Sequence, residues 1–148
     1  MARLGRIQTR FRAIAKYKGF FQINYIASIA IRIGEALLFN DIDPRKCQFR
    51  VHYMTVRGPR IITLVYGNQV LAEQDVEYRS SAEENMALLG HALAGTGVAV
   101  GANIAVLGFP IIDPRGGGPH KKVLEVRAAV RAHWPGLRES ILRKKAKL

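Results

Sequence analysis

The chain has 148 residues, a length that predicts one domain able to bury a core without a disulfide or a metal ion. Its hydrophobic fraction of 49% excludes general disorder. The charge is unusual, because 23 Lys and Arg residues against 11 Asp and Glu residues give a formal net charge of +12. Such a charge favours polyanionic partners: nucleic acid, an anionic membrane surface or an acidic protein.

The N-terminal segment is predicted to form a basic amphipathic helix or arm over residues 2–18, because its apolar residues recur at helical spacing. Gly19 would end this helix. The aromatic residues interleaved with the basic ones could stack against bases; they are Phe11, Tyr17, Phe20 and Phe21. The basic residues could neutralise phosphates without recognising bases; they are Arg3, Arg6, Arg10, Arg12, Lys16 and Lys18.

A second amphipathic helix is predicted over residues 21–39. Its apolar residues share one broad face, while Asn24, Ser28, Arg32 and Glu35 lie on the other.

The sequence Ile-Asp-Pro-Arg occurs twice, at residues 42–45 and again at residues 112–115. The flanking patterns differ, so we interpret the pair as repeated turn chemistry rather than as a duplication. An aspartate before proline leaves the helical region and can bond the following backbone. Arg45 and Arg115 would then project from exposed corners, where they could contact a partner.

Residues 47–78 are predicted to form a three-stranded antiparallel meander. Apolar and polar residues alternate along the first strand, and residues 57–60 form a turn. Gly67 and Asn68 have the composition of a two-residue hairpin.

A short helix is expected next, since Ser81 and Glu84 have the spacing of a capping box and Gly95 would end the helix. Residues 98–112 are apolar and are interpreted as a buried strand. The alternative is a membrane span over residues 86–112, which contain no Asp, Glu, Lys or Arg. The capping box and the glycines favour the helix and strand.

The C-terminal part is predicted to contain a glycine-rich loop, a helix over residues 119–133 that Pro135 and Gly136 break, and a basic helix or tail over residues 137–148. The loop could hold an anion at the start of the helix, although it matches neither common phosphate-binding consensus and a flexible connector is the alternative. The residues of this candidate site are Gly116, Gly117, Gly118, Lys121 and Lys122, and the basic residues of the tail are Arg143, Lys144, Lys145 and Lys147.

No catalytic constellation is visible in the sequence. The four histidines are scattered, and His91 is interpreted as a hydrogen-bonded core or interface residue. Cys47 and His52 lie five residues apart on a predicted strand, so their side chains would face opposite sides. We therefore expect no enzyme, no metal site and no cofactor.

The single cysteine cannot form an internal disulfide, which is typical of a protein from a reducing compartment. Residues 1–21 are basic but contain no uninterrupted apolar segment, so we expect no signal peptide. These features favour a location in a virion or in the host cytoplasm.

The predicted fold is α+β. A small, mostly antiparallel sheet, made of the meander at residues 47–78 and a strand at residues 98–112, is packed by an N-terminal amphipathic helix, a central helix and C-terminal helices. We expect a single domain over residues 1–148, with a basic N-terminal arm or helix over residues 1–18 and a basic C-terminal tail over residues 137–148.

The expected function is that of a non-enzymatic structural or assembly component of a large complex. A virion or bacteriophage-particle protein (capsid, connector, neck or tail) fits best, with cationic arms that contact nucleic acid or neighbouring subunits of an oligomer. Two alternatives stay open: a ribosome-like nucleoprotein subunit that binds nucleic acid non-specifically, and a small membrane-associated subunit with a span at residues 86–112.

Overall fold

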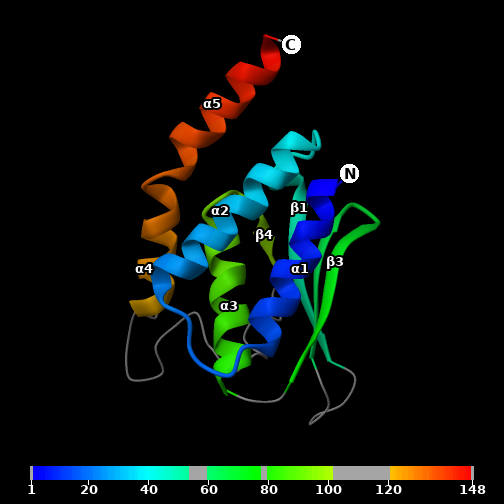
Figure 1. The fold of residues 1–148 in the computed structure, drawn as a ribbon, viewed down its shortest axis with the longest axis vertical. Helices are drawn as coiled ribbons and strands as arrows, with labels where there is room; N and C mark the ends of the chain where they lie inside the picture. The colour runs from blue at the N-terminus through cyan, green and yellow to red at the C-terminus, as the bar shows by residue number, and fades with distance from the viewer. Residues whose placement is uncertain (1, 54–59, 78–79, 102–120, 148) are drawn as a thin grey trace.

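The computed structural model describes residues 2–53, 60–77, 80–101 and 121–147, and it confirms the α+β class (Figure 1). Helices pack around a small four-stranded sheet. The elements in chain order are α1 (Ala2–Lys16), α2 (Ile23–Phe39), the 3-10 helix η1 (Pro44–Lys46), β1 (Cys47–Tyr53), β2 (Arg60–Tyr66), β3 (Gln69–Val76), α3 (Ser80–Ala94), β4 (Ala99–Val100), α4 (Lys121–Arg131) and α5 (Trp134–Ala146).

The sheet has the strand order β3-β2-β1-β4. β1, β2 and β3 form the expected antiparallel meander, and Gly67 turns the β2–β3 hairpin with a φ of 59°. β4 runs parallel to β1, so the sheet is mixed but mostly antiparallel. The strand predicted at residues 98–112 is seen at Ala99–Val100, and its residues 102–112 lie outside the described part of the chain.

Helix α1 is part of the core. Ile7, Phe11 and Ile14 are fully buried, as their helical spacing predicts. Phe11 meets Phe49 of β1 edge to face, with ring centroids 6.2 Å apart, so it is a core residue and not a platform for bases. Gln8 extends the contact to β3, because its side chain accepts from the backbone N–H of Glu73 (2.9 Å) and donates to the carbonyl of the same residue (2.8 Å).

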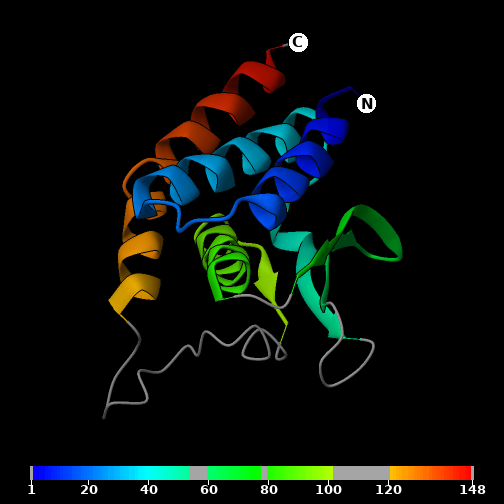
Figure 2. The same cartoon turned by 60° about the horizontal axis from the view of Figure 1, so that its bottom comes forward.

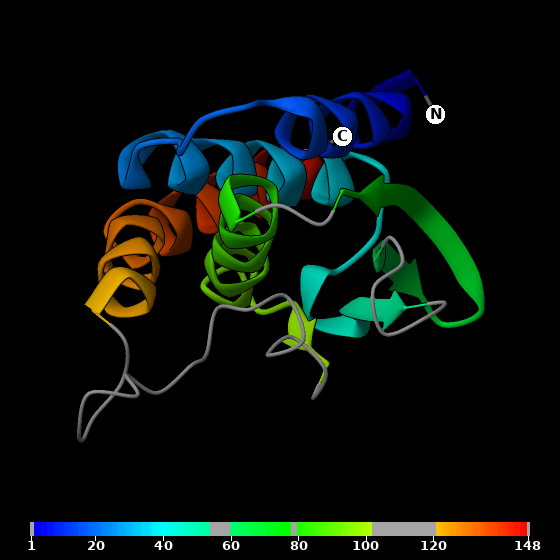
Figure 3. The ribbon, with the colours of Figure 1, turned by 90° about the horizontal axis from the view of Figure 1, so that it is seen from below.

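Helix α2 lies between α1 and α5, and α3 lies beneath it, between α4 and the sheet (Figures 1 and 3). Trp134, at the start of α5, is buried against Gly34 of α2, where a Cβ atom would come within 2.6 Å of the Trp134 ring. The helix break predicted at Pro135 and Gly136 is wrong. The break lies at residues 132–133, and Pro135 and Gly136 belong to the first turn of α5. A proline is tolerated there because the N–H groups of the first turn have no partner within the helix.

The end of α3 decides the course of the apolar segment that follows it. Gly97 has a φ of 102°, and the N–H of Val98 donates to the carbonyl of Leu93 (3.1 Å), which is the pattern of a Schellman motif. The helix ends at Ala94, as the predicted stop at Gly95 requires, and Gly97 carries the positive φ of the turn that leads into β4. In the described part of the chain, no helix has the length and apolarity needed to cross a membrane.

Candidate functional site

Helices α1 and α2 run in opposite directions (Figures 1 and 2). Residues of both helices line a groove of about 490 Å³. It is lined from three parts of the chain: by α1, by the segment that connects α1 to α2, and by α2. Its lining includes Arg6, Arg10 and Ile14 from α1, Phe21 from the connection, and Tyr25 and Arg32 from α2.

Three guanidinium groups, those of Arg6, Arg10 and Arg32, gather at this groove and at a smaller hollow of about 260 Å³ that they share with Glu35. Among the described residues, none of the three forms an ion pair with a carboxylate within 4.0 Å. Burial, together with the charges of Arg32 and Arg6, lowers the pKa of Arg10. The groove is thus a region of positive potential that an anion would relieve.

A row of stacked aromatic rings adjoins these charges. The ring of Phe21 lies 4.2 Å from that of Tyr17 and 4.9 Å from that of Tyr25, centroid to centroid, with interplanar angles of 19° and 26°. Tyr17 and Tyr25, at the two ends of the row, are 46% and 53% exposed. Arginines and an aromatic stack therefore meet in one groove.

The fully buried Asn85 of α3 holds the segment that carries the aromatic row. Its amide donates to the carbonyl of Gly19 (2.8 Å), and its side-chain oxygen accepts from the N–H of Phe21 (3.0 Å). These two bonds satisfy backbone groups of the irregular α1–α2 connection and fix its position.

Of the basic residues predicted near the N-terminus, Arg6 and Arg10 line the groove. Arg12, Lys16 and Lys18 are exposed and do not line it. The side chain of Arg3 and the residues Arg115, Gly116, Gly117 and Gly118 lie outside the part of the chain that the structure describes.

Most of the other predicted basic residues have a carboxylate partner. The pairs are Lys121 with Glu125 (3.8 Å), Lys122 with Glu84 (2.9 Å), Arg143 with Glu139 (2.6 Å) and Lys145 with Asp41. Lys144 of α5 and Lys147, which directly follows the helix, are exposed. Helix α5 ends on the side of the molecule where α1 begins (Figures 1 and 2). The cationic ends of the chain are thus brought to the same side.

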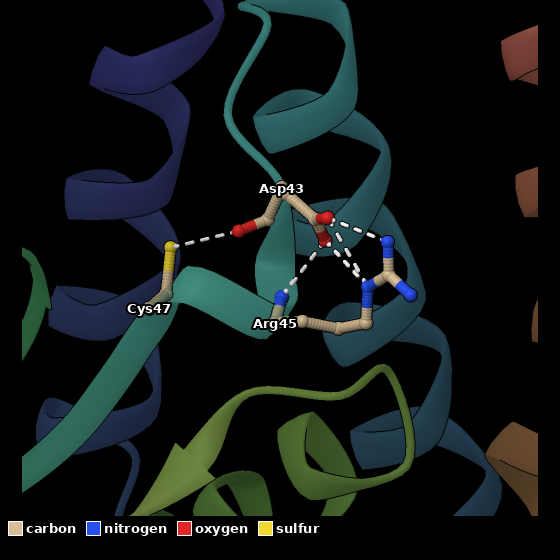
Figure 4. Close-up of polar contacts among 3 residues, drawn as sticks. All are labelled: Asp43, Arg45 and Cys47. Carbon is tan, nitrogen blue, oxygen red and sulfur yellow. Dashed lines mark hydrogen bonds and ion pairs between the residues drawn. The ribbon is translucent and has the colours of Figure 1, made fainter.

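The first Ile-Asp-Pro-Arg sequence forms the predicted Asp-Pro turn (Figure 4). Asp43 caps η1 by accepting from the N–H of Arg45 (3.0 Å), and the Arg45 guanidinium folds back onto the same carboxylate (2.8 Å). This hydrogen bond lowers the pKa of Asp43. Arg45 is exposed, as predicted, but it is paired with Asp43. The second Ile-Asp-Pro-Arg sequence, at residues 112–115, lies outside the described residues.

Two titratable side chains are buried away from the groove. Burial, helped by the charge of Asp43, raises the pKa of the Cys47 thiol to about 11, so the thiol is protonated at neutral pH. His91 of α3 is fully buried, and its Nδ1 lies 3.2 Å from a guanidinium nitrogen of Arg127 on α4, which confirms the predicted hydrogen-bonded core histidine. Across the described ranges, no three His, Cys, Asp or Glu residues gather as a metal site requires.

Sequence reasoning missed Arg32, Tyr25 and Asn85 as residues of the groove or its support. The sequence contains a signal for Tyr25 and Arg32. Together with Phe21 and Ser28 they have the spacing of one helical stripe, so they are expected to share a helix face. Comparison of the chain with protein-family models, with curated proteins and with solved structures gave no match. The functional reading therefore depends on the geometry alone.

Proposed function

We propose that the chain is a non-enzymatic structural component of a large nucleoprotein assembly, of the kind found in a virion or bacteriophage particle, and that it binds nucleic acid through the α1–α2 groove. One observation carries the proposal: Arg6, Arg10 and Arg32 converge on a groove without ion-paired carboxylates in the described part of the chain. Phosphate groups would supply the missing negative charge, and contacts of this kind are independent of base sequence.

The groove arginines differ from the cations that support the fold. Arg60 lies 3.4 Å from Glu83, and Lys122 lies 2.9 Å from Glu84, so each contributes to an ion pair that joins two segments. Burial, followed by the charges of Arg32 and Arg6, lowers the pKa of Arg10, while the charge of Glu35 acts in the opposite direction. The repulsion among the arginines raises the free energy of the unliganded protein. A bound phosphate would remove that repulsion, which makes a ligand site a better account of the cluster than a structural role.

The remaining cationic surface supports an assembly role. The exposed lysines of α5 give the phosphate backbone, or a neighbouring subunit, a second contact on the side where α1 begins. A virion or the host cytoplasm is the proposed location, and the buried, protonated thiol of Cys47 is compatible with it.

Binding of a labelled oligonucleotide over a series of salt concentrations tests this proposal. The Arg10→Ala/Arg32→Ala variant removes two groove charges, and Arg12→Ala/Lys16→Ala is the matched control because it removes two exposed charges of α1 outside the groove. Removing two phosphate contacts should make the negative slope of log K against log[salt] less steep by about 1.4 on a single strand. We expect a clearly smaller change in the control, and equal changes in the two variants would contradict the assignment of the groove.

A further inference from the structure

The α1–α2 groove combines two kinds of recognition in one hollow. Arg10 and Arg32 provide positive charge, and the rings of Phe21 and Tyr25 line the same space. A ligand in the groove would therefore meet a cation and an aromatic ring together.

The faces of nucleobases are covered by their neighbours in a duplex and become available for stacking on a protein ring only when the strand is unpaired. We propose, resting on the proposed function, that the groove binds single-stranded nucleic acid. The phosphates of the strand lie at Arg6, Arg10 and Arg32, and one of its unpaired bases stacks on the ring of Tyr25.

The size of the groove fits this occupant. Its volume of about 490 Å³ falls in the range of sites for a single small molecule, roughly 300–1,000 Å³. It would admit one nucleotide, whereas a duplex could only touch its rim. Bases of any kind could stack there, because every base has an aromatic face.

The stacking platform is held in place before a ligand arrives. Phe21 stacks on Tyr25 with centroids 4.9 Å apart, and the backbone of Phe21 is hydrogen-bonded to the buried Asn85. A ring that is already supported loses little conformational freedom on binding, so stacking contributes more fully to affinity. Asn85 is thus a positioning residue for the site and does not line it.

The test measures the affinities of labelled oligothymidylate, oligouridylate and a DNA duplex of the same length by fluorescence anisotropy. Tyr25→Ala should weaken binding of the single strands by about tenfold, which is typical of the loss of one stacked base, and should leave duplex affinity nearly unchanged. Tyr25→Phe should bind like the wild type. Phe20→Ala is the matched control, since Phe20 is 58% exposed in the same segment but does not line the groove. The ratio of the affinities for the two single strands shows whether DNA or RNA is preferred.

The Arg10→Ala/Arg32→Ala variant separates the failure of this inference from the failure of the proposed function. If it binds neither single strand nor duplex more weakly than the wild type, the proposed function fails. The proposed function stands if the arginine variant binds both single strand and duplex more weakly. In that case the inference fails if folded Tyr25→Ala keeps its single-strand affinity, or if it loses single-strand and duplex affinity equally. Vesicles that contain anionic lipid form a further arm, and a loss confined to vesicle binding in Tyr25→Ala would assign the groove to a membrane surface instead. If circular dichroism shows that Tyr25→Ala does not fold, Tyr25→Leu takes its place, because it keeps an apolar side chain without an aromatic face.

Discussion

Acidification is expected to destabilise the protein through His91. The imidazole is fully buried on α3, and burial, followed by the charge of Arg127, lowers its pKa from an ordinary value of 6.5 to about 4. The folded state therefore binds this proton less readily than the unfolded state does. The contribution of the neutral imidazole to stability is fully present above pH 6.5 and is lost as the pH falls from about 6.5 towards 4.

The magnitude follows from the difference between the two pKa values. At ~1.4 kcal/mol for each pH unit, the loss on acidification amounts to about 3 kcal/mol. Urea unfolding followed by circular dichroism over a pH series measures it. We expect His91→Gln, whose amide oxygen can still accept from Arg127, to lose stability less steeply than the wild type over this range. His52→Gln, which replaces an exposed histidine of β1, should follow the wild-type curve. Parallel curves for the wild type and His91→Gln would refute the reasoning.

Three further predictions concern packing, the support of the groove and the buried thiol. Gly34→Ala places a Cβ atom 2.6 Å from the buried ring of Trp134. It should lower the free energy of unfolding by about 1–2 kcal/mol, since overpacking outweighs the gain in helix propensity. An unchanged urea midpoint would contradict this. Asn85→Ala leaves the N–H of Phe21 and the carbonyl of Gly19 without their partner and should cost about 1–3 kcal/mol in urea unfolding. The same variant should bind single strands more weakly although Asn85 does not line the groove, and full affinity in the folded variant would count against a positioning role. Cys47, with its thiol pKa raised to about 11, should react with a thiol reagent at neutral pH only as urea unfolds the protein, and rapid labelling of the native state would be inconsistent with its burial.

Local patterns were sufficient to predict the elements of the fold. The helical spacing of Ile7, Phe11 and Ile14 identifies the buried face of α1, because only one face of a helix of this kind can pack on a core. The hairpin at Gly67 was predictable because a two-residue turn needs positive φ angles. The end of α3 before Gly95 was predictable, but the glycine that adopts the positive φ, Gly97, was not, since several nearby glycines can provide the same conformation and tertiary packing selects among them.

The candidate site was only partly predictable because it depends on which helices become neighbours. Arg6 and Arg10 stand out in the sequence as basic residues, but their proximity to Arg32 arises when α2 folds back along α1. Asn85 contacts Phe21 across 64 residues of sequence, and no local pattern reports such a contact. The second Ile-Asp-Pro-Arg sequence and the glycine-rich loop lie outside the described residues, and their roles stay predictions.

The central claim, that nucleic acid occupies the α1–α2 groove, is tested most directly by photo-cross-linking. A single strand that carries a photoreactive base would be irradiated in complex with the protein, and the cross-linked tryptic peptides would be identified by mass spectrometry. A base stacked on Tyr25 predicts cross-links in the peptide of residues 19–32, which contains Phe21 and Tyr25 and ends at Arg32. Cross-links confined to peptides of α5, with none in residues 19–32, would contradict the account.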